Sequence, residues 1–539
     1  MTRLNTLIAA ASLLALTQGC ASDPLPQAAP GEPHRAQTSR YFQPGESTSE
    51  GTVAVEGASI DYRAVAGTLI VHPRGWDDAA DKPDARDKDS TNPTAEAAMF
   101  YVAYFKNGEN AHTRPITFVF NGGPGSSSMW LHMGAFGPRR IVTADDTHTP
   151  AAPYRLINND ASLLDASDLV FIDAPGTGFG RVTGKDKEKA FFGVDPDVHA
   201  FAEFLTQFLS KYGPWNSPKY LFGESYGTPR AAALVNVLEM EHDVDFNGVI
   251  LLSQILNYDL ATGGAEFNPG VDLPYQLALP TYTATAWFHH KLPDNSKALE
   301  PLLEDVEHFA LTDYALALGA GADLDPERRA AIAQKLHDYT GLPVDYIMKA
   351  NLRIDGGEFE KNLQADTDTT IGRLDTRFSG PTLDPLSKSA EYDPQSASID
   401  SAYVSAFNDY VRNVLHYGEG KTYNAQIGLY RRWDFRHTPP GRRDPAPQSM
   451  NVMPDLANAM KINPDLKVQL NAGYYDLATP FFEGVYEMRH LPIPEKLQSN
   501  IEFKFYKSGH MVYAHEGALK QLHDNVAAFI AQTDNLKGE

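Results

Sequence analysis

Two kinds of hydrophobic pattern follow each other along the chain, and they predict two kinds of strand. Three early segments have the pattern of a β-meander: residues 52–55, 67–71 and 99–104. Four later segments are almost continuously apolar: residues 116–120, 169–172, 220–222 and 249–252. Strands that are buried on both faces have this pattern, and helices between them make a parallel sheet. We therefore expect an α/β fold with a mostly parallel central sheet.

Helical periodicity places helices after several of these strands. In residues 196–212, apolar side chains fall on one helical face at Val198, Phe201, Phe204, Leu205 and Phe208. A second helix is predicted where Asp325 can cap the first turn and Pro326 can occupy it, with Ile332, Leu336 and Tyr339 on one stripe.

The alternation of strands and helices fades between residues 257 and 449, where aromatic-rich helical pieces and polar loops take its place. Regular strands return at residues 467–470 and 501–506. The pattern predicts a core built from residues 51–256 and 450–539, with an inserted, mainly helical cap domain at residues 257–449. The residues that select a substrate's side chain are expected in this insertion.

The N-terminus has the pattern of an export signal. Arg3 precedes an apolar run from Leu7 to Leu16, which is too short to span a bilayer. The run ends in a segment that resembles a bacterial lipobox, in which Cys20 would be lipidated. Cys20 is the only cysteine, and lipidation would account for an unpaired thiol in an oxidising compartment.

We therefore expect a signal peptide at residues 1–19 and a flexible tether, rich in Pro, Ala, Gln and Ser, at residues 20–50. The expected product is a bacterial lipoprotein of the periplasm or outer membrane, attached through lipidated Cys20. The alternative is ordinary signal cleavage nearby, with a soluble periplasmic product.

Composition narrows the choice of function. The 539 residues are 42% hydrophobic and 21% charged, as in globular proteins, and the net charge is -23. Phosphate binding needs clustered Lys and Arg, so we expect no nucleic-acid ligand. Nothing in the sequence implies a metal or a cofactor. No sequence pattern indicates an oligomeric state.

A candidate nucleophile lies between a predicted strand and a predicted helix. The segment Gly223-Glu224-Ser225-Tyr226-Gly227 has the form G-x-S-x-G, after the strand at 220–222 and before the helix-like run 230–235. In this position the pattern is typical of a nucleophile elbow, where small neighbours let a strained serine project its hydroxyl. Ser225 is the predicted nucleophile, and a structural turn is the alternative.

A serine nucleophile needs a base and an acid that orients the base. In this fold the three residues follow the order Ser, Asp, His, with the last two in loops after late strands. Asp476 follows the strand at 467–470, and His510 follows the strand at 501–506. Other histidines (His132, His289, His290, His523) end no late strand, and Asp455 and Asp465 precede the strand. The predicted triad is Ser225, Asp476 and His510.

The glycine-rich segment 121–128 follows the strand at 116–120. Glycines there let backbone N–H groups approach a developing oxyanion, and we expect Gly123 and Tyr226 to donate them. A phosphate-binding loop is the alternative, but the Gly-Lys-Ser/Thr ending of such loops is missing.

These segments, together with residues 173–179, resemble the serine carboxypeptidase family in content and order. The resemblance implies an α/β-hydrolase fold, a peptide substrate and a hydrolase that removes C-terminal residues. It also implies that Asn121, Gly122 and Glu224 hold the terminal carboxylate of the peptide.

The chain departs from the family pattern at Ala135, where members often carry a second glutamate that pairs with the first. Ser126 also replaces a cysteine that is common in the glycine loop. Loss of the carboxyl pair weakens the reason for Glu224 to stay protonated. An esterase or acyltransferase with the same triad is therefore the alternative within enzymes. A binding or scaffold lipoprotein on an inactive hydrolase fold is the alternative outside them.

Overall fold

The computed structural model describes residues 41–43, 45–80, 92–110, 112–263, 265–446 and 449–536. The chain divides into a segment, Met1–Arg40, and a compact unit, Tyr41–Glu539. The predicted signal peptide and Cys20 lie outside the described residues.

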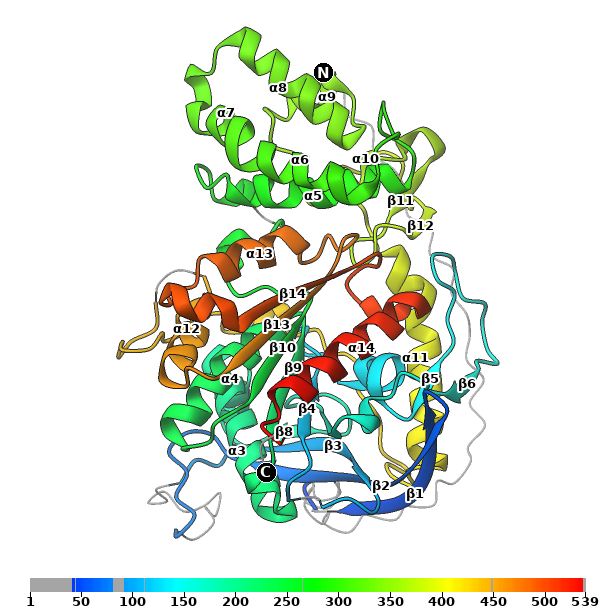
Figure 1. The fold of residues 1–539 in the computed structure, drawn as a ribbon, viewed down its shortest axis with the longest axis vertical. Helices are drawn as coiled ribbons and strands as arrows, with labels where there is room; N and C mark the ends of the chain where they lie inside the picture. Colours follow the sequence, from blue (N-terminus) through cyan, green and yellow to red (C-terminus); the bar gives the residue numbers. More distant parts are fainter. Residues whose placement is uncertain are drawn as a thin grey trace, which may run out of the picture. The chain divides into compact units, whose positions relative to one another are not determined.

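The described residues form a ten-stranded sheet in the order β1-β2-β3-β7-β4-β9-β10-β13-β14, with β8 paired to β3 (Figure 1). β1 to β3 are the predicted antiparallel meander, and β7, β4, β9, β10, β13 and β14 run parallel. The strands are β1 Glu46–Val55, β2 Ala58–Val71, β3 Glu96–Lys106, β4 Ile116–Phe120, β7 Asp168–Ile172, β8 Arg181–Thr183, β9 Lys219–Glu224, β10 Gly248–Leu252, β13 Lys467–Gly473 and β14 Ile501–Tyr506.

Alternate side chains of the parallel strands enter two different cores. Phe118 and Phe120 of β4 pack with one hydrophobic cluster, whereas Val119 packs with the other. Figure 1 shows helices on both sides of the sheet, with α3, α4 and α12 on one side and α11 and α14 on the other. This burial on both faces is why the strands are continuously apolar in sequence.

The helices around the sheet are α2 Lys187–Phe191, α3 Val194–Tyr212, α4 Gly227–Glu241, α11 Pro394–Asn413, α12 Met453–Ile462, α13 Phe481–Arg489 and α14 Glu516–Thr533. Two short strand pairs lie outside the main sheet: β5 Arg139–Ile141 with β6 Leu156–Asn158, and β11 Thr369–Ile371 with β12 Ser379–Pro381.

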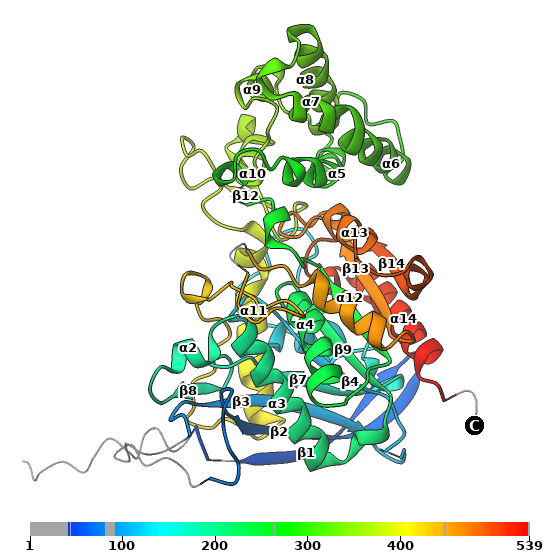
Figure 2. The ribbon, with the colours of Figure 1, turned by 90° about the vertical axis from the view of Figure 1, so that its left-hand side faces the viewer.

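A third hydrophobic cluster lies within the predicted cap insertion, at residues 265–371, and includes Leu477 from the core. Its helices are α5 Leu273–Phe288, α6 Leu299–Phe309, α7 Ala315–Ala320, α8 Pro326–Thr340, α9 Val344–Lys349 and α10 Gly356–Asn362. Figure 2 shows α5 to α10 as one group, and α5 contacts α13 of the core. In contrast, α11 packs on the core, because Ile399, Tyr403 and Phe407 belong to a core cluster.

Parallel strands flanked by helices on both faces, with a helical insertion after β10, confirm the predicted α/β-hydrolase fold. The helices predicted at 196–212 and after Asp325 are α3 and α8, and the Asp325 side chain accepts hydrogen bonds from Glu327 N and Arg328 N. β1 begins at Glu46, inside the stretch expected to be a tether, because it pairs along its whole length with β2.

Candidate active site

Ser225 lies at the sharp turn between β9 and α4. Its φ of 57° is in the left-handed region, where a non-glycine residue is strained. Added Cβ atoms at Gly223 and Gly227 would collide with neighbouring backbone, so the turn requires glycine on both sides. Ser225 N donates to Leu252 O at 3.0 Å, and Ser225 O accepts from Thr228 N at 2.8 Å. The backbone therefore holds this strained serine from both neighbouring elements.

Asp476 and His510 come together from loops after β13 and β14, as the chain order of the two strands requires. His510 Nδ1 lies 2.8 Å from Asp476 Oδ2. Asp476 is fully buried, and its carboxylate also accepts hydrogen bonds from Ala478 N, Thr479 N and Thr479 Oγ1 at 2.9, 3.0 and 2.7 Å. These donors hold the carboxylate in place and aim it at the imidazole.

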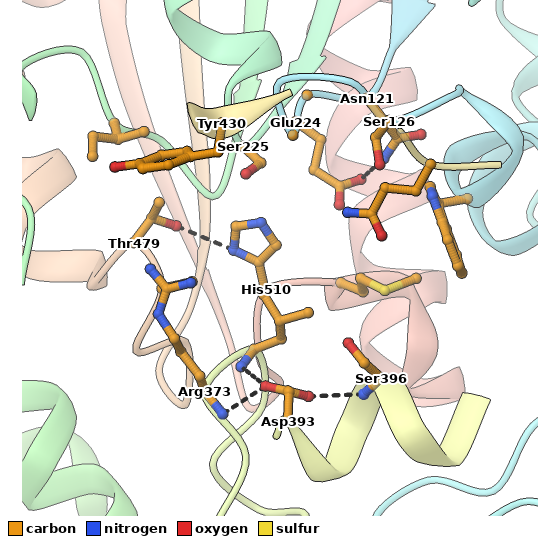
Figure 3. Close-up of a pocket in the computed structure, with 18 of the residues that line it drawn as sticks. Asn121, Ser126, Glu224, Ser225, Arg373, Asp393, Ser396, Tyr430, Thr479 and His510 are labelled. Carbon is orange, nitrogen blue, oxygen red and sulfur yellow. Dashed lines mark hydrogen bonds between the residues drawn. The ribbon is translucent and has the colours of Figure 1, made fainter. Parts of the chain in front are cut away.

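Ser225 and His510 face the same pocket, which has a volume of about 530 Å³ (Figure 3). Burial lowers the pKa of His510, but the charge and hydrogen bond of Asp476 and the charge of Glu224 outweigh burial, so the pKa lies above its usual value. The Ser225 hydroxyl forms no hydrogen bond with any described residue. Such contacts are often long in hydrolases before substrate binds.

Two backbone N–H groups are available beside Ser225. Gly123, with φ 108°, and Tyr226 are the residues predicted to donate to an oxyanion. An added Cβ at Gly122 would collide with Tyr226 N, so the glycine loop lies directly against the elbow. No described residue accepts a hydrogen bond from Gly123 N or Tyr226 N. Both amides are therefore free to bind a negative oxygen.

Arg230 of α4 supports the glycine loop from behind. Its side chain is buried, with Nε 2.6 Å from Asp197 Oδ2 and Nη1 2.8 Å from Asn121 O. Its guanidinium also lies over the Tyr226 ring, 5.4 Å from the centroid. Arg230 thus connects α3, through its ion pair with Asp197, to the loop that carries Asn121, through its hydrogen bond to Asn121 O.

Asn121 and Glu224 lie side by side in the pocket. Asn121 Nδ2 and the Tyr513 hydroxyl both donate to Glu224 Oε2, each at 2.8 Å. Burial raises the pKa of Glu224 to about 7, although the charge of His510 and the hydrogen bonds from Tyr513 and Asn121 act in the opposite direction. Burial is the largest cause, and the charge of Asp476 adds to it, so this carboxyl is partly protonated near neutral pH.

Ala135 lies buried in the short helix Leu131–Phe136. Tyrosine rings pack against the same helix, because an added Cβ at Gly134 would collide with Tyr403 and Tyr513. Burial raises the pKa of Tyr513 well above its usual value, so its phenol stays a hydrogen-bond donor. Glu224 thus has a phenol donor beside it in addition to the Asn121 amide.

A segment between the cap and α11 binds both triad loops. Leu477 N donates to Arg373 O at 3.0 Å, and His510 N donates to Leu374 O at 2.6 Å. Gly509 N donates to Asp375 Oδ2 at 3.1 Å. The position of Asp476 relative to His510 therefore depends on residues 373–375 of the predicted insertion.

Sequence reasoning missed Thr479 and Arg373, which line this pocket, and the buried Tyr513, which donates to Glu224. Thr479 and Tyr513 each lie three residues after a predicted triad member, and this proximity was the only sequence signal they carried. Arg373 had none, because its place in the pocket depends on how the insertion folds.

The described residues contain neither a cluster of metal-binding side chains nor a membrane-spanning helix. No group of three or more His, Cys, Asp or Glu side chains there is placed to hold a metal ion. No helix among those residues is long and apolar enough to cross a membrane.

Comparison with known proteins gives a family-model match over part of the chain. Residues 90–260 match the family model described as serine carboxypeptidase. Similar curated proteins are the pheromone-processing carboxypeptidases KEX1 of Yarrowia lipolytica and Phytophthora infestans. The first is 33% identical over 141 residues, which cover 26% of this chain and 21% of the relative. The second is 29% identical over 171 residues, which cover 29% of this chain and 26% of the relative.

The chain thus spans about a fifth to a quarter of the length of these relatives. Among solved structures, a prohormone-processing carboxypeptidase from Saccharomyces cerevisiae, Kex1(delta)p, aligns with a TM-score of 0.49 and 15% identity, over 86% of this chain and 91% of that one. The family match includes the glycine loop and the Ser225 elbow. Between residues 90 and 260, therefore, the chain carries the sequence pattern of the serine carboxypeptidase family.

Proposed function

We propose that the protein is a serine-type carboxypeptidase that removes C-terminal residues from peptides through an acyl-enzyme on Ser225. The observation that carries this proposal is a single pocket that contains both the Ser225 and His510 side chains and the hydrogen-bonded pair Asn121 and Glu224. The first pair suits acyl transfer, and the second suits recognition of a free carboxylate.

In the acylation step, His510 Nε2 takes the proton of Ser225 Oγ as the oxygen attacks the scissile carbonyl carbon. The carbonyl oxygen becomes negative and accepts hydrogen bonds from the backbone N–H groups of Gly123 and Tyr226. His510 then gives its proton to the leaving amine, and the C–N bond breaks. Asp476 holds Nδ1–H and stabilises the imidazolium throughout.

In the second step, a water molecule gives a proton to His510 and attacks the ester carbonyl. The ester C–O bond breaks, and Ser225 Oγ recovers the proton from His510. The new carboxylate of the shortened peptide then leaves, and the enzyme returns to its starting state.

Carboxylate recognition follows from the hydrogen-bond roles of Asn121 and Glu224. An amide NH₂ has two donors, so Asn121 can donate one to Glu224 and the other to a substrate. Oε2 of Glu224 accepts two hydrogen bonds, which leaves Oε1 as the site of the proton in the neutral acid. A protonated Oε1 can donate to a carboxylate, whereas an ionised Glu224 would repel it.

The pH dependence has a definite sign. Glu224, with a pKa of about 7, is neutral below that pH and charged above it. Binding of a free-acid peptide should therefore weaken as pH rises through about 7.

The test compares a blocked dipeptide that has a free C-terminal carboxylate with its C-terminal amide between pH 4 and 8, with Ser225→Ala as the blank. We expect a preference for the free acid at pH 5 that fades above pH 7. Equal rates on acid and amide at pH 5 would remove the carboxypeptidase assignment.

Ala135 favours a second candidate, an esterase or acyltransferase with the same triad, because the family's paired carboxyl is missing there. A simple ester that is hydrolysed much faster than the free-acid dipeptide would support this candidate.

We further propose that the protein is exported and that Cys20 carries a lipid anchor in the periplasm or outer membrane of a bacterium. The support is the sequence of residues 1–21, with a basic residue, a short apolar run and a single cysteine. Metabolic labelling with a fatty acid should mark the full-length protein and not its Cys20→Ala variant. Equal labelling of both would contradict the proposal.

A further inference from the structure

Arg373 places a cationic side chain in the active-site pocket. Its backbone is held on two sides, because Arg373 N donates to Asp393 Oδ2 at 2.7 Å and Arg373 O accepts from Leu477 N at 3.0 Å. The next residue, Leu374, accepts a hydrogen bond from His510 N. The side chain therefore starts from a point that is fixed relative to Asp476 and His510.

Arg373 is exposed and lines the pocket, and its guanidinium forms no hydrogen bond or ion pair with the described part of the chain. An arginine presents five N–H donors in a planar fork that matches a carboxylate. The Arg373 side chain is thus a free recognition group beside the reacting atoms.

Acidic groups near Arg373 form no ion pair with its guanidinium in the described part of the chain. Burial raises the pKa of Glu360 to about 8, and burial together with Glu487 raises the pKa of Glu483 well above its usual value. Asp393 accepts three backbone hydrogen bonds, from Arg373, Leu374 and Ser396. Burial and Asp393 raise the pKa of Asp400, which also lines the pocket, to about 7.

Figure 3 shows Arg373 and Asn121 on opposite sides of Ser225 and His510, with Glu224 on the side of Asn121. If Asn121 and Glu224 hold the terminal carboxylate, the leaving residue occupies their side of the pocket. The acyl part of the substrate must then extend to the other side, where Arg373 and Thr479 lie.

We propose that Arg373 forms a subsite for a carboxylate side chain of the residue on the acyl side of the scissile bond. The enzyme would thus prefer peptides with Asp or Glu before the C-terminal residue. The choice of the acyl side rests on the proposed function, because it depends on where the terminal carboxylate binds.

The test measures kcat/KM at pH 6 for three blocked dipeptides that end in alanine and differ only in the preceding residue: Glu, Gln or Lys. A glutamate side chain, with a pKa of about 4.3, is ionised at this pH. We expect the wild-type enzyme to prefer Glu over Gln. In Arg373→Gln the Glu/Gln ratio should fall about tenfold, the lower end of the range for loss of a hydrogen bond to a charged group, because Arg373 is exposed.

Two further variants sharpen the result. Arg373→Glu should raise the Lys/Gln ratio above that of the wild type. The matched control is Arg328→Gln, an exposed arginine on α8 whose Nη2 lies 3.8 Å from Asp313, and it should leave all ratios unchanged. A wild-type preference for Lys, or an equal loss on all three peptides in Arg373→Gln, would overturn the proposal.

Simple esters of the same blocked Glu and Gln residues separate this proposal from the proposed function. They contain the acyl side of the substrate and no terminal carboxylate. If peptides show no free-acid preference, the carboxypeptidase proposal fails, and the ester ratio still reports Arg373. If free-acid preference is found but Arg373→Gln changes neither ratio, only the subsite fails.

Discussion

Tyr513 donates its phenol hydrogen to Glu224 Oε2 at 2.8 Å, and Asn121 donates to the same oxygen. Both contacts favour the ionised carboxylate over the neutral acid. The substitution Tyr513→Phe removes one of them and keeps the ring that packs against the short helix containing Gly134. We expect the pKa of Glu224 to rise.

The size of this rise follows from the difference between two hydrogen bonds. A hydrogen bond to a charged group contributes about 1.5–3 kcal/mol and one to a neutral group about 0.5–1.5 kcal/mol, so the ionised form loses about 1–1.5 kcal/mol more. At 1.36 kcal/mol per pKa unit, the pKa of Glu224 should rise by about one unit. The pH at which free-acid binding is half lost should therefore move from about 7 to about 8.

The assay is KM as a function of pH from 4 to 9 for a blocked free-acid dipeptide, with a simple ester as the reference substrate. The matched control is Tyr403→Phe, because Tyr403 is buried beside the same glycine and no described residue is hydrogen-bonded by its hydroxyl. A shift of equal size in both variants, or no shift in Tyr513→Phe, would refute the reasoning.

Three further predictions concern the surroundings of the site. Thr479→Val removes a donor at 2.7 Å from Asp476 and should lower kcat about tenfold with KM unchanged; an unchanged kcat would contradict the role of Thr479. Arg230→Met leaves a buried Asp197 without its partner and should cost about 3–5 kcal/mol in urea unfolding, and a loss under about 1 kcal/mol would argue against the ion pair. Glu483 is buried without a described hydrogen-bond partner, and burial raises its pKa well above the usual value. The folded protein therefore binds a proton that the unfolded chain has lost above about pH 4.3, so stability falls as pH rises. Glu483→Gln should reduce the drop in melting temperature between pH 5 and 8, and an unchanged drop would exclude Glu483 as its source.

The fold could be predicted from the sequence because its strands carry a local signature. A strand buried on both faces must be apolar at nearly every position, as in residues 116–120 and 249–252. Parallel strands also fix an edge where loops meet, so chain order alone suggested that the loops after β13 and β14 would approach Ser225. The Asp476–His510 contact follows that expectation.

Other features depend on contacts between segments far apart in the chain. The hydrogen bonds from Leu477 and His510 to residues 373 and 374, and the packing of α11 on the core, exist only when the insertion has folded. The raised pKa of Glu224 likewise comes from burial, which no residue type reports by itself.

By itself, then, the sequence determined the α/β sheet, the glycine-flanked serine and the order of the triad loops, since local periodicity and chain order encode all three. Only the tertiary structure decided which phenol meets Glu224 and that Arg373 reaches the pocket unpaired. The reason is physical: such contacts are set by the packing of remote side chains, and a one-dimensional pattern carries no distance between them.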